Sequence, residues 1–473
     1  MDVKKVFAKH ISFTKERFFT RYRKLSENEP YHVLLESGRG GRYSIAGIRP
    51  FAIIRAKKDG VDIQTKNETL HIAGKPLRAM KKWMEQFTIK PAPNLPDFQG
   101  GAIGYISYDY VRHIETLPKI ALDDLQLPLL YFLVFKEWAI FDHQKNCLSI
   151  VLLDDEKKAE KARRKLESLT NQWLDEEDTV EMIPTNKEKE AMTEVSFSEN
   201  EFQQAVEKIQ AYIAQGDVYQ VNLTVRQMKQ LGVPPLHVYE ELRKLNPSPY
   251  MSYLHTPEFQ LVSSSPELLV KKKKQSVHTR PIAGTRKRGL SVEEDVRLAK
   301  ELIENKKEQA EHMMVIDLER NDLGKVCAYG TVEVDEWMAI EKYSHVMHIV
   351  SNIRGKLREE KDGYDLIEAM FPGGTITGAP KIRTMEIIEE LEPVRRGIYT
   401  GSIGWIGFQG DLELNIVIRT MIVHEGKAYV QAGAGIVHDS SPKSEYVESI
   451  AKAEALWNAK EAAERRKVRG LDH

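Results

Sequence analysis

The sequence predicts a protein of mixed helices and strands, built as one large domain or as two interleaved ones. The chain has 473 residues, of which 41% are hydrophobic and 29% charged, so a sizeable core is expected. Its first 150 residues contain alternating, strand-like stretches such as YHVLLES and RYSIAGI, with glycine pairs in GRGGRY and FQGGAIGY. Beyond residue 195, a helix-start signal leads into helical and strand-like segments.

Composition and charge exclude several classes of protein. The net charge of −1 does not indicate a protein that binds nucleic acid or an anionic membrane surface, because such proteins usually carry an excess of basic residues. Apolar runs stay below the roughly 20 residues that a membrane span needs, and the N-terminus lacks the apolar stretch of a signal peptide. With two cysteines, Cys147 and Cys327, a disulfide framework is excluded and a cytoplasmic location is expected. Neither cysteine has a neighbouring histidine, so each is interpreted as a buried small hydrophobe.

The chain divides by composition into four segments. Residues 1–153 are strand-rich, 154–195 form a charged helix and a polar linker, 196–460 form the second region, and 461–473 form a charged tail. The second region opens with a capping box from Ser198 to Glu201, and Gly216 ends that helix. The strand that follows has two different faces, with Tyr219, Val221, Leu223 and Val225 on one and Gln220, Asn222, Thr224 and Arg226 on the other. The polar face points to solvent or to a polar cavity, and the stretch alone favours solvent.

Acidic residues recur at helical spacing in two segments. Glu304, Glu308 and Glu311 are spaced i, i+4 and i+7. In the second segment, Ser441 is a candidate N-cap, Pro442 suits the first helical position, and Glu445 and Glu448 are three residues apart. Carboxylates converging from two helices suit Mg²⁺. By themselves, however, these patterns favour a solvated acidic face.

Two glycine-rich stretches are candidates for anion binding. Residues 371–393, FPGGTITGAPKIRTMEIIEELEP, run from a glycine-rich loop into a helix whose N-terminus favours anions. The G-K-[ST] of a phosphate-binding loop is absent. In QAGAGIV, residues 431–437, Gly433 and Gly435 allow a ligand carboxylate to approach the backbone. Ordinary tight turns remain the alternative for both stretches.

Many motifs in order make the chain similar to the chorismate-utilising enzymes, from about residue 30 to residue 458. The motifs are LLES (34–37), FQGGAIGYISYDYVR (98–112), NPSPYM (246–251), SSPELLV (264–270), TRPIAGT (279–285), AEHMMVIDLERNDLG (310–324), EKYSHVMHIVS (341–351), FPGGTITGAPK (371–381), YTGSIG (399–404), IRT (418–420) and AGAGIV (432–437). The resemblance implies an α+β fold like that of anthranilate synthase component I. In it, a large antiparallel β-sandwich carries helices outside and the active cleft between its layers.

The resemblance also assigns roles to residues of this sequence. It implies Mg²⁺ held directly by Glu311 and Glu448, with Glu308 and Glu445 in the outer shell through water. His348 would donate a proton beside the leaving hydroxyl, with Gly284 and Thr285 along the substrate ring. The remaining substrate contacts implied are Tyr399, Arg419, Gly433, Ala434, Gly435, Thr377 and Lys381. LLES and NPSPYM match a tryptophan pocket, with Ser37, Pro247, Tyr250 and Met251.

Two positions narrow the expected reaction. Isochorismate and salicylate synthases carry a lysine where this chain has Gln220, and glutamine cannot deprotonate water, so ammonia is the expected nucleophile. Many aminodeoxychorismate synthases carry PIKGT, whose lysine attacks C2 of chorismate, whereas this chain has Ala283, as anthranilate synthases do.

Other features favour amination at C4 over amination at C2 with loss of pyruvate. They are the DVYQVNL context, the NIVIRT stretch and the short chain. Ammonia would come from a glutaminase partner subunit, since neither cysteine is a candidate nucleophile. A non-catalytic regulator that binds chorismate or tryptophan is a third, minor alternative.

Overall fold

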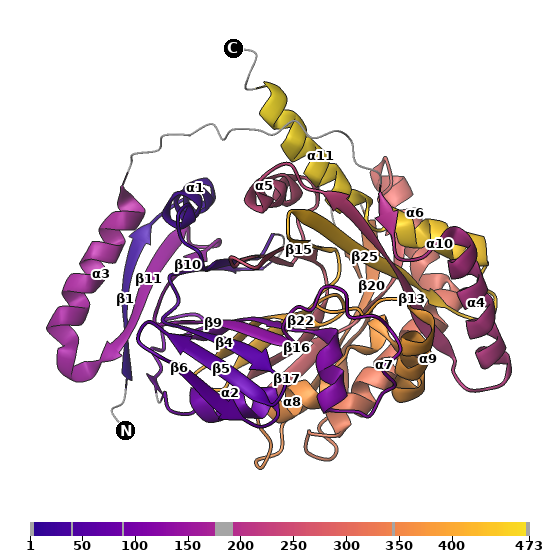
Figure 1. Ribbon diagram of the computed structural model, residues 1–473, viewed down its shortest axis with the longest axis horizontal. Helices are drawn as coiled ribbons and strands as arrows, with labels where there is room; N and C mark the ends of the chain where they lie inside the picture. Colours follow the sequence, from indigo (N-terminus) through magenta and orange to yellow (C-terminus); the bar gives the residue numbers. More distant parts are fainter. Residues whose placement is uncertain (1–3, 39–40, 88, 176–192, 343–345, 470–473) are drawn as a thin grey trace.

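The protein is a two-layer β-structure with helices on its outer faces (Figure 1). The computed structural model describes residues 4–38, 41–87, 89–175, 193–342 and 346–469. Nearly all strand pairs are antiparallel, and residues of both layers share one core cluster that includes Val33, Ile103, Leu254 and Ile403. No helix in these ranges is long and apolar enough to cross a membrane.

Within the described residues, thirteen strands form the first sheet, and both halves of the chain contribute to it. In order across the sheet they are β12 (Glu194–Val195), β13 (Gln220–Gln230), β25 (Lys427–Ile436), β24 (Thr420–His424), β15 (Phe259–Ser265), β14 (Tyr250–His255), β2 (His32–Glu36), β3 (Tyr43–Ile48), β10 (Glu137–Asp142), β11 (Cys147–Asp155), β1 (Lys4–Ser12) and β7 (Ile89–Lys90), with β21 (Gly378–Ala379) beside β13. The pairing of β14 with β2 joins the two halves of the chain.

The second sheet has twelve strands among the described residues, and it also mixes the two halves. Its order is β18 (Ile282–Lys287), β20 (Val346–Lys356), β17 (Ser276–Arg280), β16 (Leu268–Lys273), β23 (Leu412–Ile416), β22 (Ser402–Gly407), β8 (Gly101–Ile106), β9 (Leu130–Phe135), β4 (Ala52–Lys57), β5 (Gly60–Thr65) and β6 (Thr69–Ala73), with β19 (Glu333–Lys342) beside β20. Here β22 pairs with β8 across the two halves.

Helices cover the outside of both sheets. They are α1 (Lys15–Ser26), α2 (Pro76–Met84), α3 (Ala159–Leu174), α4 (Glu199–Ala214), α5 (Pro235–Leu245), α6 (Val292–Glu304), α7 (Lys306–Gly324), α8 (Gly363–Met370), α9 (Lys381–Leu391), α10 (Pro442–Ala451) and α11 (Glu454–Arg469). Figure 1 shows α1, α5 and α11 above the first sheet, α2 and α8 below the second, and α4, α7, α9 and α10 at one end. That end carries AEHMMVIDLERNDLG on α7 and the start of α9, into which FPGGTITGAPK runs.

Local signals explain where the key helices begin. The predicted capping box is present at α4, where the Ser198 side chain accepts from the Glu201 N–H and Glu201 accepts from the Ser198 N–H. Asn305 caps α7 by accepting from the N–H groups of Lys307 and Glu308. This cap separates α6 from α7, so Glu304 ends α6 and does not belong to the acidic stripe of α7.

Two predicted segment boundaries differ in the structure, and a third segment lies largely outside the residues that the structure describes. Strand β11 continues to Asp155, past the predicted boundary at residue 153, because its whole length pairs with β1. The predicted tail from residue 461 is part of α11, where Ala463 is buried. Most of the predicted linker, residues 176–192, lies outside the described residues.

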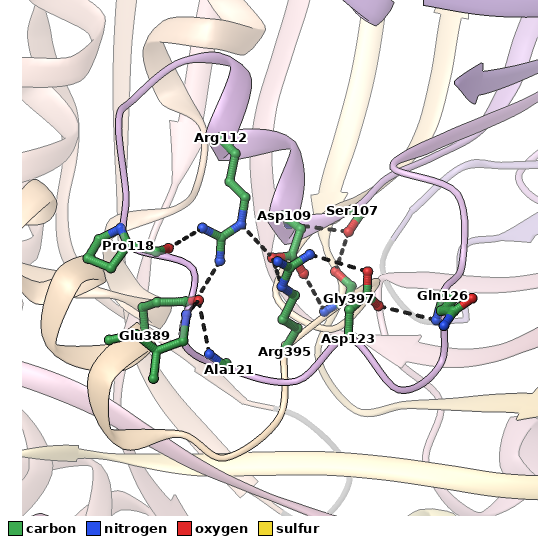
Figure 2. A network of polar contacts seen from close by, with 11 residues as sticks. Ser107, Asp109, Arg112, Pro118, Ala121, Asp123, Gln126, Glu389, Arg395 and Gly397 are labelled. Atoms are coloured by element: carbon green, nitrogen blue, oxygen red, sulfur yellow. Dashed lines mark hydrogen bonds and ion pairs between the residues drawn. The ribbon is translucent and has the colours of Figure 1, made fainter. Parts of the chain in front are cut away.

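A buried polar network fixes the first half of the chain to the segment behind α9 (Figure 2). Glu389 on α9 accepts from the backbone N–H groups of Ile120 and Ala121 and pairs with Arg112. Asp109 accepts from Arg112 and from the backbone N–H of Gly397, at 3.3 and 3.0 Å. Since residue 397 lies two positions before Tyr399, this network anchors one wall of the site described next.

Candidate active site

A cavity of about 230 Å³ lies between the two sheets. Strands β13 and β25 of the first sheet and β18 and β20 of the second all contribute to its wall. The lining residues are Asn222, Pro266, Glu267, Ile282, Ala283, Gly284, Thr285, His348, Thr375, Ile376, Tyr399, Ile418, Arg419, Val430, Gln431, Ala432, Gly433 and Lys452. Its volume is somewhat below the roughly 300–1,000 Å³ of typical ligand pockets, so it has room for one small molecule. The predicted cleft between the layers is therefore present.

The polar face of β13 points into this interior and not to solvent, which corrects the expectation from the stretch alone. Asn222 lines the cavity, and Thr224 and Arg226 are buried. The buried Asn222 Oδ1 has no hydrogen-bond partner among the described residues. Tyr219 is 72% exposed and precedes the strand, because β13 begins at Gln220. An unpaired buried oxygen at a cavity wall suits a bound ligand.

A bulge in β18 sets the geometry of the TRPIAGT motif. The pairing of β18 with β20 shifts register between Ala283 and Thr285, and Gly284 occupies the bulge with φ +60°. A Cβ at Gly284 would lie 2.8 Å from Glu308 Oε2, so only glycine fits there without displacement. The bulge places Thr285 opposite His348, with Oγ1 and Nδ1 3.0 Å apart.

Burial keeps His348 neutral near physiological pH. It lowers the histidine's pKa to about 4, and the positive charge of Arg419 adds to the effect. The ring Nδ1 also lies 3.2 Å from the Gly284 carbonyl oxygen, which can only accept, so Nδ1 carries the proton. The other ring nitrogen is then an acceptor. A neutral imidazole in this tautomer is suited to positioning a hydroxyl and is a poor proton donor.

Two predicted substrate contacts, Tyr399 and Arg419, lie together in the cavity wall. Arg419 adopts φ +49°, a strained conformation for a residue with a side chain, which is typical of functional positions. Tyr399 is buried, and burial raises the pKa of its phenol, so it stays protonated and can donate. A guanidinium and a phenol in the wall of one cavity suit a carboxylate.

Four predicted metal ligands gather beside the cavity on two helices. Glu308 and Glu311 lie on α7, and Glu445 and Glu448 lie on α10. Burial raises the pKa of Glu311, and the charges of the other three carboxylates add to the rise, so the four are close enough to repel. Ser441 occupies the predicted N-cap position of α10, although without a side-chain cap bond.

The carboxylates fit Mg²⁺ in their chemistry, since hard oxygen donors are what this cation prefers. Three of the four carboxylates form ion pairs with basic side chains. The N···O distances are 3.0 Å for Arg286–Glu308, 2.8 Å for Lys452–Glu448 and 3.9 Å for Lys307–Glu311. Over the described part of the chain, no three acidic, histidine or cysteine side chains converge tightly enough to hold an ion. Their roles as ligands stay predictions.

Five other predicted site residues do not line the cavity. They are Gln220, Thr377, Lys381, Ala434 and Gly435. Gln220 Nε2 would lie only 2.0 Å from a Cβ at Gly435, so the glutamine covers this glycine. Gly433, Ala434 and Gly435 are part of β25 and form neither a tight turn nor a separate backbone loop. Of these three, Gly433 lines the cavity and Ala434 packs in the hydrophobic core.

The two predicted contacts from the FPGGTITGAPK loop also lie behind the wall. Thr377 is buried and donates to the Gly373 carbonyl at 3.0 Å. Lys381 forms an ion pair with Asp322 of α7. Both stabilise the loop that carries Thr375 and Ile376, which do line the cavity.

Two chemically important lining residues were not singled out from the sequence. Glu267 is 5% exposed, and burial raises its pKa to about 7. Lys452 donates to the Gly433 carbonyl and pairs with Glu448, both at 2.8 Å. The sequence contains a signal for each of them. Glu267 is the one acidic residue in SSPELLV, and Lys452 follows Glu448 by four residues, the spacing of an ion pair on a helix.

A second, larger cavity of about 620 Å³ adjoins the first, and the two share Pro266 and Ile282 in their walls. Three residues of the predicted tryptophan pocket, Ser37, Tyr250 and Met251, line it, whereas Pro247 does not. Tryptophan binding there stays a prediction.

The cysteines lie away from both cavities. Cys327 is buried, and burial raises its pKa to about 11, so it is a thiol and not a thiolate nucleophile at neutral pH. This agrees with the interpretation of the sequence for Cys327, whereas Cys147 is only partly buried.

The fold is that of a known group of enzymes. The structure of anthranilate synthase component I from Streptococcus pneumoniae TIGR4 superposes with a TM-score of 0.76 at 33% identity, over 88% of this chain and 92% of that one. This confirms the predicted fold class. The model of the chorismate binding enzyme family matches residues 31–458, and the chain belongs to that family.

Two curated relatives are similar over nearly their full lengths. Aminodeoxychorismate synthase component 1 of Bacillus subtilis (strain 168) is 54% identical, over 96% of this chain and 97% of the relative. Anthranilate synthase component 1 of Acetivibrio thermocellus is 44% identical, over 91% of this chain and 90% of the relative.

Proposed function

We propose that the chain is the chorismate-aminating component of an aminodeoxychorismate synthase, which replaces the C4 hydroxyl of chorismate with an amino group. The observation that carries this proposal is the 54% identity to the Bacillus subtilis aminodeoxychorismate synthase component 1, over nearly the full length of both chains. The cavity supports it, because it combines cationic groups, a buried carboxylic acid and a neutral histidine in a space for one small molecule.

A guanidinium and a phenol account for substrate binding. Arg419 and Tyr399 hold one carboxylate of chorismate through the fixed guanidinium fork and the phenol. His348 accepts from the C4 hydroxyl and orients it. The roles follow from the position of these side chains in the wall and from the protonation states that burial imposes.

Glu267 is the proton donor that we favour, in place of the predicted His348. A leaving hydroxyl needs a proton, and a group with a pKa near the working pH donates it best. The pKa of Glu267 is about 7, whereas that of His348 is about 4. Near neutral pH a large fraction of the Glu267 carboxyl is still protonated, whereas the His348 ring is neutral.

Mg²⁺ would be held by Glu311 and Glu448, with Glu308 and Glu445 behind them. When bound, it supplies positive charge to a substrate carboxylate and lowers the barrier to loss of the hydroxyl. Burial raises the pKa of Glu311 and the charges of the other three carboxylates add to the rise, and a cation at this place would relieve both effects.

Ammonia comes from a partner glutaminase in this proposal. The buried Cys327 is not a nucleophile, and neither cysteine lines a cavity, so this chain offers no thiol to cleave glutamine. The two curated relatives are named as component 1, which is consistent with a second subunit.

Anthranilate synthesis, amination at C2 with loss of pyruvate, is the second candidate. It is favoured by Ala283, which lines the cavity without an amine, and by the 44% identity to the Acetivibrio thermocellus enzyme.

The first prediction is the identity of the product. Purified chain would be incubated with chorismate, Mg²⁺ and ammonium, with and without an aminodeoxychorismate lyase, and products would be separated by mass and fluorescence. We expect a product that keeps the enolpyruvyl group and becomes 4-aminobenzoate only after lyase is added. Anthranilate formed without lyase would overturn C4 amination and select the second candidate.

A further inference from the structure

The side-chain oxygen of Asn222 is a hydrogen-bond acceptor in the cavity wall that the reaction described so far does not use. Asn222 lies on β13 and lines the cavity, and its buried Oδ1 has no hydrogen-bond partner among the described residues. Gln220, two residues earlier on the same face of the strand, does not line the cavity. Of these two amide side chains, the one at residue 222 therefore opens onto the space for the reactants.

Neighbouring groups set the direction of this amide. Its Nδ2 lies 3.5 Å from the Thr375 carbonyl oxygen, which can only accept, so the nitrogen end faces that carbonyl and Oδ1 faces away from it. Oδ1 would lie 2.9 Å from a Cβ at Gly433, another residue of the cavity wall. Because residue 433 is a glycine, the space beside the oxygen stays open.

Main-chain contacts hold Asn222 in place. Its N–H donates to the Thr377 carbonyl at 2.8 Å, and its carbonyl accepts from Arg396 Nη2 at 2.7 Å. Arg396 is fixed in turn by a buried ion pair with Glu392, also at 2.7 Å. The acceptor is therefore positioned before any ligand arrives, and such preorganisation lowers the entropic cost of binding.

The two reactants differ in the number of hydrogen-bond donors that they bring. Chorismate has carboxylates, which are ionised at neutral pH and only accept, and a single hydroxyl, so it offers one donor hydrogen. In the proposed reaction, His348 accepts that hydrogen. A second acceptor in the same cavity therefore has no donor on chorismate, whereas ammonia brings three N–H groups and one lone pair.

We propose that Asn222 Oδ1 binds the incoming ammonia and directs its lone pair toward the ring, an inference that rests on the proposed function. One N–H donates to the oxygen, and the lone pair on the other side of the nitrogen forms the C–N bond. The C4–O bond breaks, and its oxygen keeps the electron pair, takes the Glu267 proton and leaves as water. The nitrogen becomes positively charged, which strengthens its hydrogen bond to Asn222. It then releases one proton to solvent, and Glu267 takes one back from solvent.

The test is Asn222→Leu, which keeps a side chain of similar size but removes the acceptor. Steady-state rates of the full chain with Mg²⁺ would be measured with ammonium varied at saturating chorismate, and then with chorismate varied at saturating ammonium. We expect KM for ammonium to rise about 10-fold through the loss of one hydrogen bond, while KM for chorismate changes less than about 2-fold. A rise in KM for chorismate alone, or equal rises in both constants, would overturn the proposal, because the oxygen would then bind the substrate or only shape the cavity.

The matched control is Asn352→Leu on β20. Asn352 is also partly buried, but its amide donates to Asp335 and lines neither cavity, so both KM values should stay at the wild-type level. If Asn222→Leu does not fold, Asn222→Ser decides by the same two constants, because its short hydroxyl does not reach the position of Oδ1. An unchanged KM for ammonium in the folded variant sinks the inference while the wild-type chain still aminates chorismate. A wild-type chain that does not aminate chorismate removes the proposed function as well.

Discussion

At the residue scale, the chemistry depends on how burial sets protonation. Glu267 and His348 line the same cavity, yet burial moves their pKa values in opposite directions, to about 7 and about 4. Both shifts have one cause, since removal from water disfavours whichever form is charged. The carboxyl therefore tends to be an acid and the imidazole a neutral acceptor, which reverses the roles that residue type alone suggests.

Glu267→Gln tests this assignment. The amide keeps the shape of the side chain but has no proton to donate, so kcat should fall about 10²–10⁴-fold while KM for chorismate changes little. Steady-state kinetics with ammonium and Mg²⁺ measure both constants. A near-normal kcat would show that another group protonates the leaving hydroxyl.

The family resemblance of the sequence predicted part of this site. Arg419, Tyr399, His348 and Thr285 belong to quoted motifs and do line the cavity. Glu267 was missed because its importance comes from complete burial beside the cavity, which depends on the packing of two sheets. Thr377 and Lys381 were predicted to contact the substrate. In the structure, Thr377 hydrogen-bonds Gly373 and Lys381 pairs with Asp322, and both contacts stabilise the loop behind the cavity wall.

At the element scale, one bulged strand aligns the catalytic wall. The register shift in β18 requires φ +60° at Gly284 and turns Thr285 toward His348 on β20. Glu308 of α7 approaches the same glycine, so the bulge also connects the cavity to the acidic helix.

Gly284→Ala should therefore impair both stability and activity. A side chain in the left-handed region costs about 1–2 kcal/mol, and the Cβ would crowd Glu308 Oε2 at 2.8 Å. The control is Gly216→Ala, where φ is +84° but nothing lies within 4 Å of the added Cβ. We expect both variants to show lower denaturation midpoints, and only Gly284→Ala to lose kcat/KM. Full activity in Gly284→Ala would contradict the importance of the bulge.

The elements themselves were partly predictable. The capping box at Ser198 is a local signal, and α4 begins there as expected. The break between α6 and α7 was missed, because the i, i+4, i+7 spacing of acids continues across it while Asn305 starts a new helix.

At the scale of the whole molecule, both sheets interleave strands from the two halves of the chain. Strand β2 of the first half pairs with β14, and β8 pairs with β22. Asp109 accepts from the backbone N–H of Gly397 and Glu389 accepts from that of Ile120, so a polar connection crosses the same boundary (Figure 2). Such pairing joins residues that are more than 200 positions apart, so local periodicity could not assign strands to sheets. Family resemblance supplied the sandwich architecture.

We infer that this cavity aminates chorismate without a covalent bond to an amine of the protein. Ala283 offers none, and Lys452, the lysine in the cavity wall, is committed to Glu448 and to the Gly433 carbonyl. The most direct measurement is the intact mass of the enzyme quenched during turnover with chorismate, Mg²⁺ and ammonium. We predict that the protein mass stays unchanged while aminated product accumulates. A mass increase that maps to a lysine, Lys452 above all, would contradict the account.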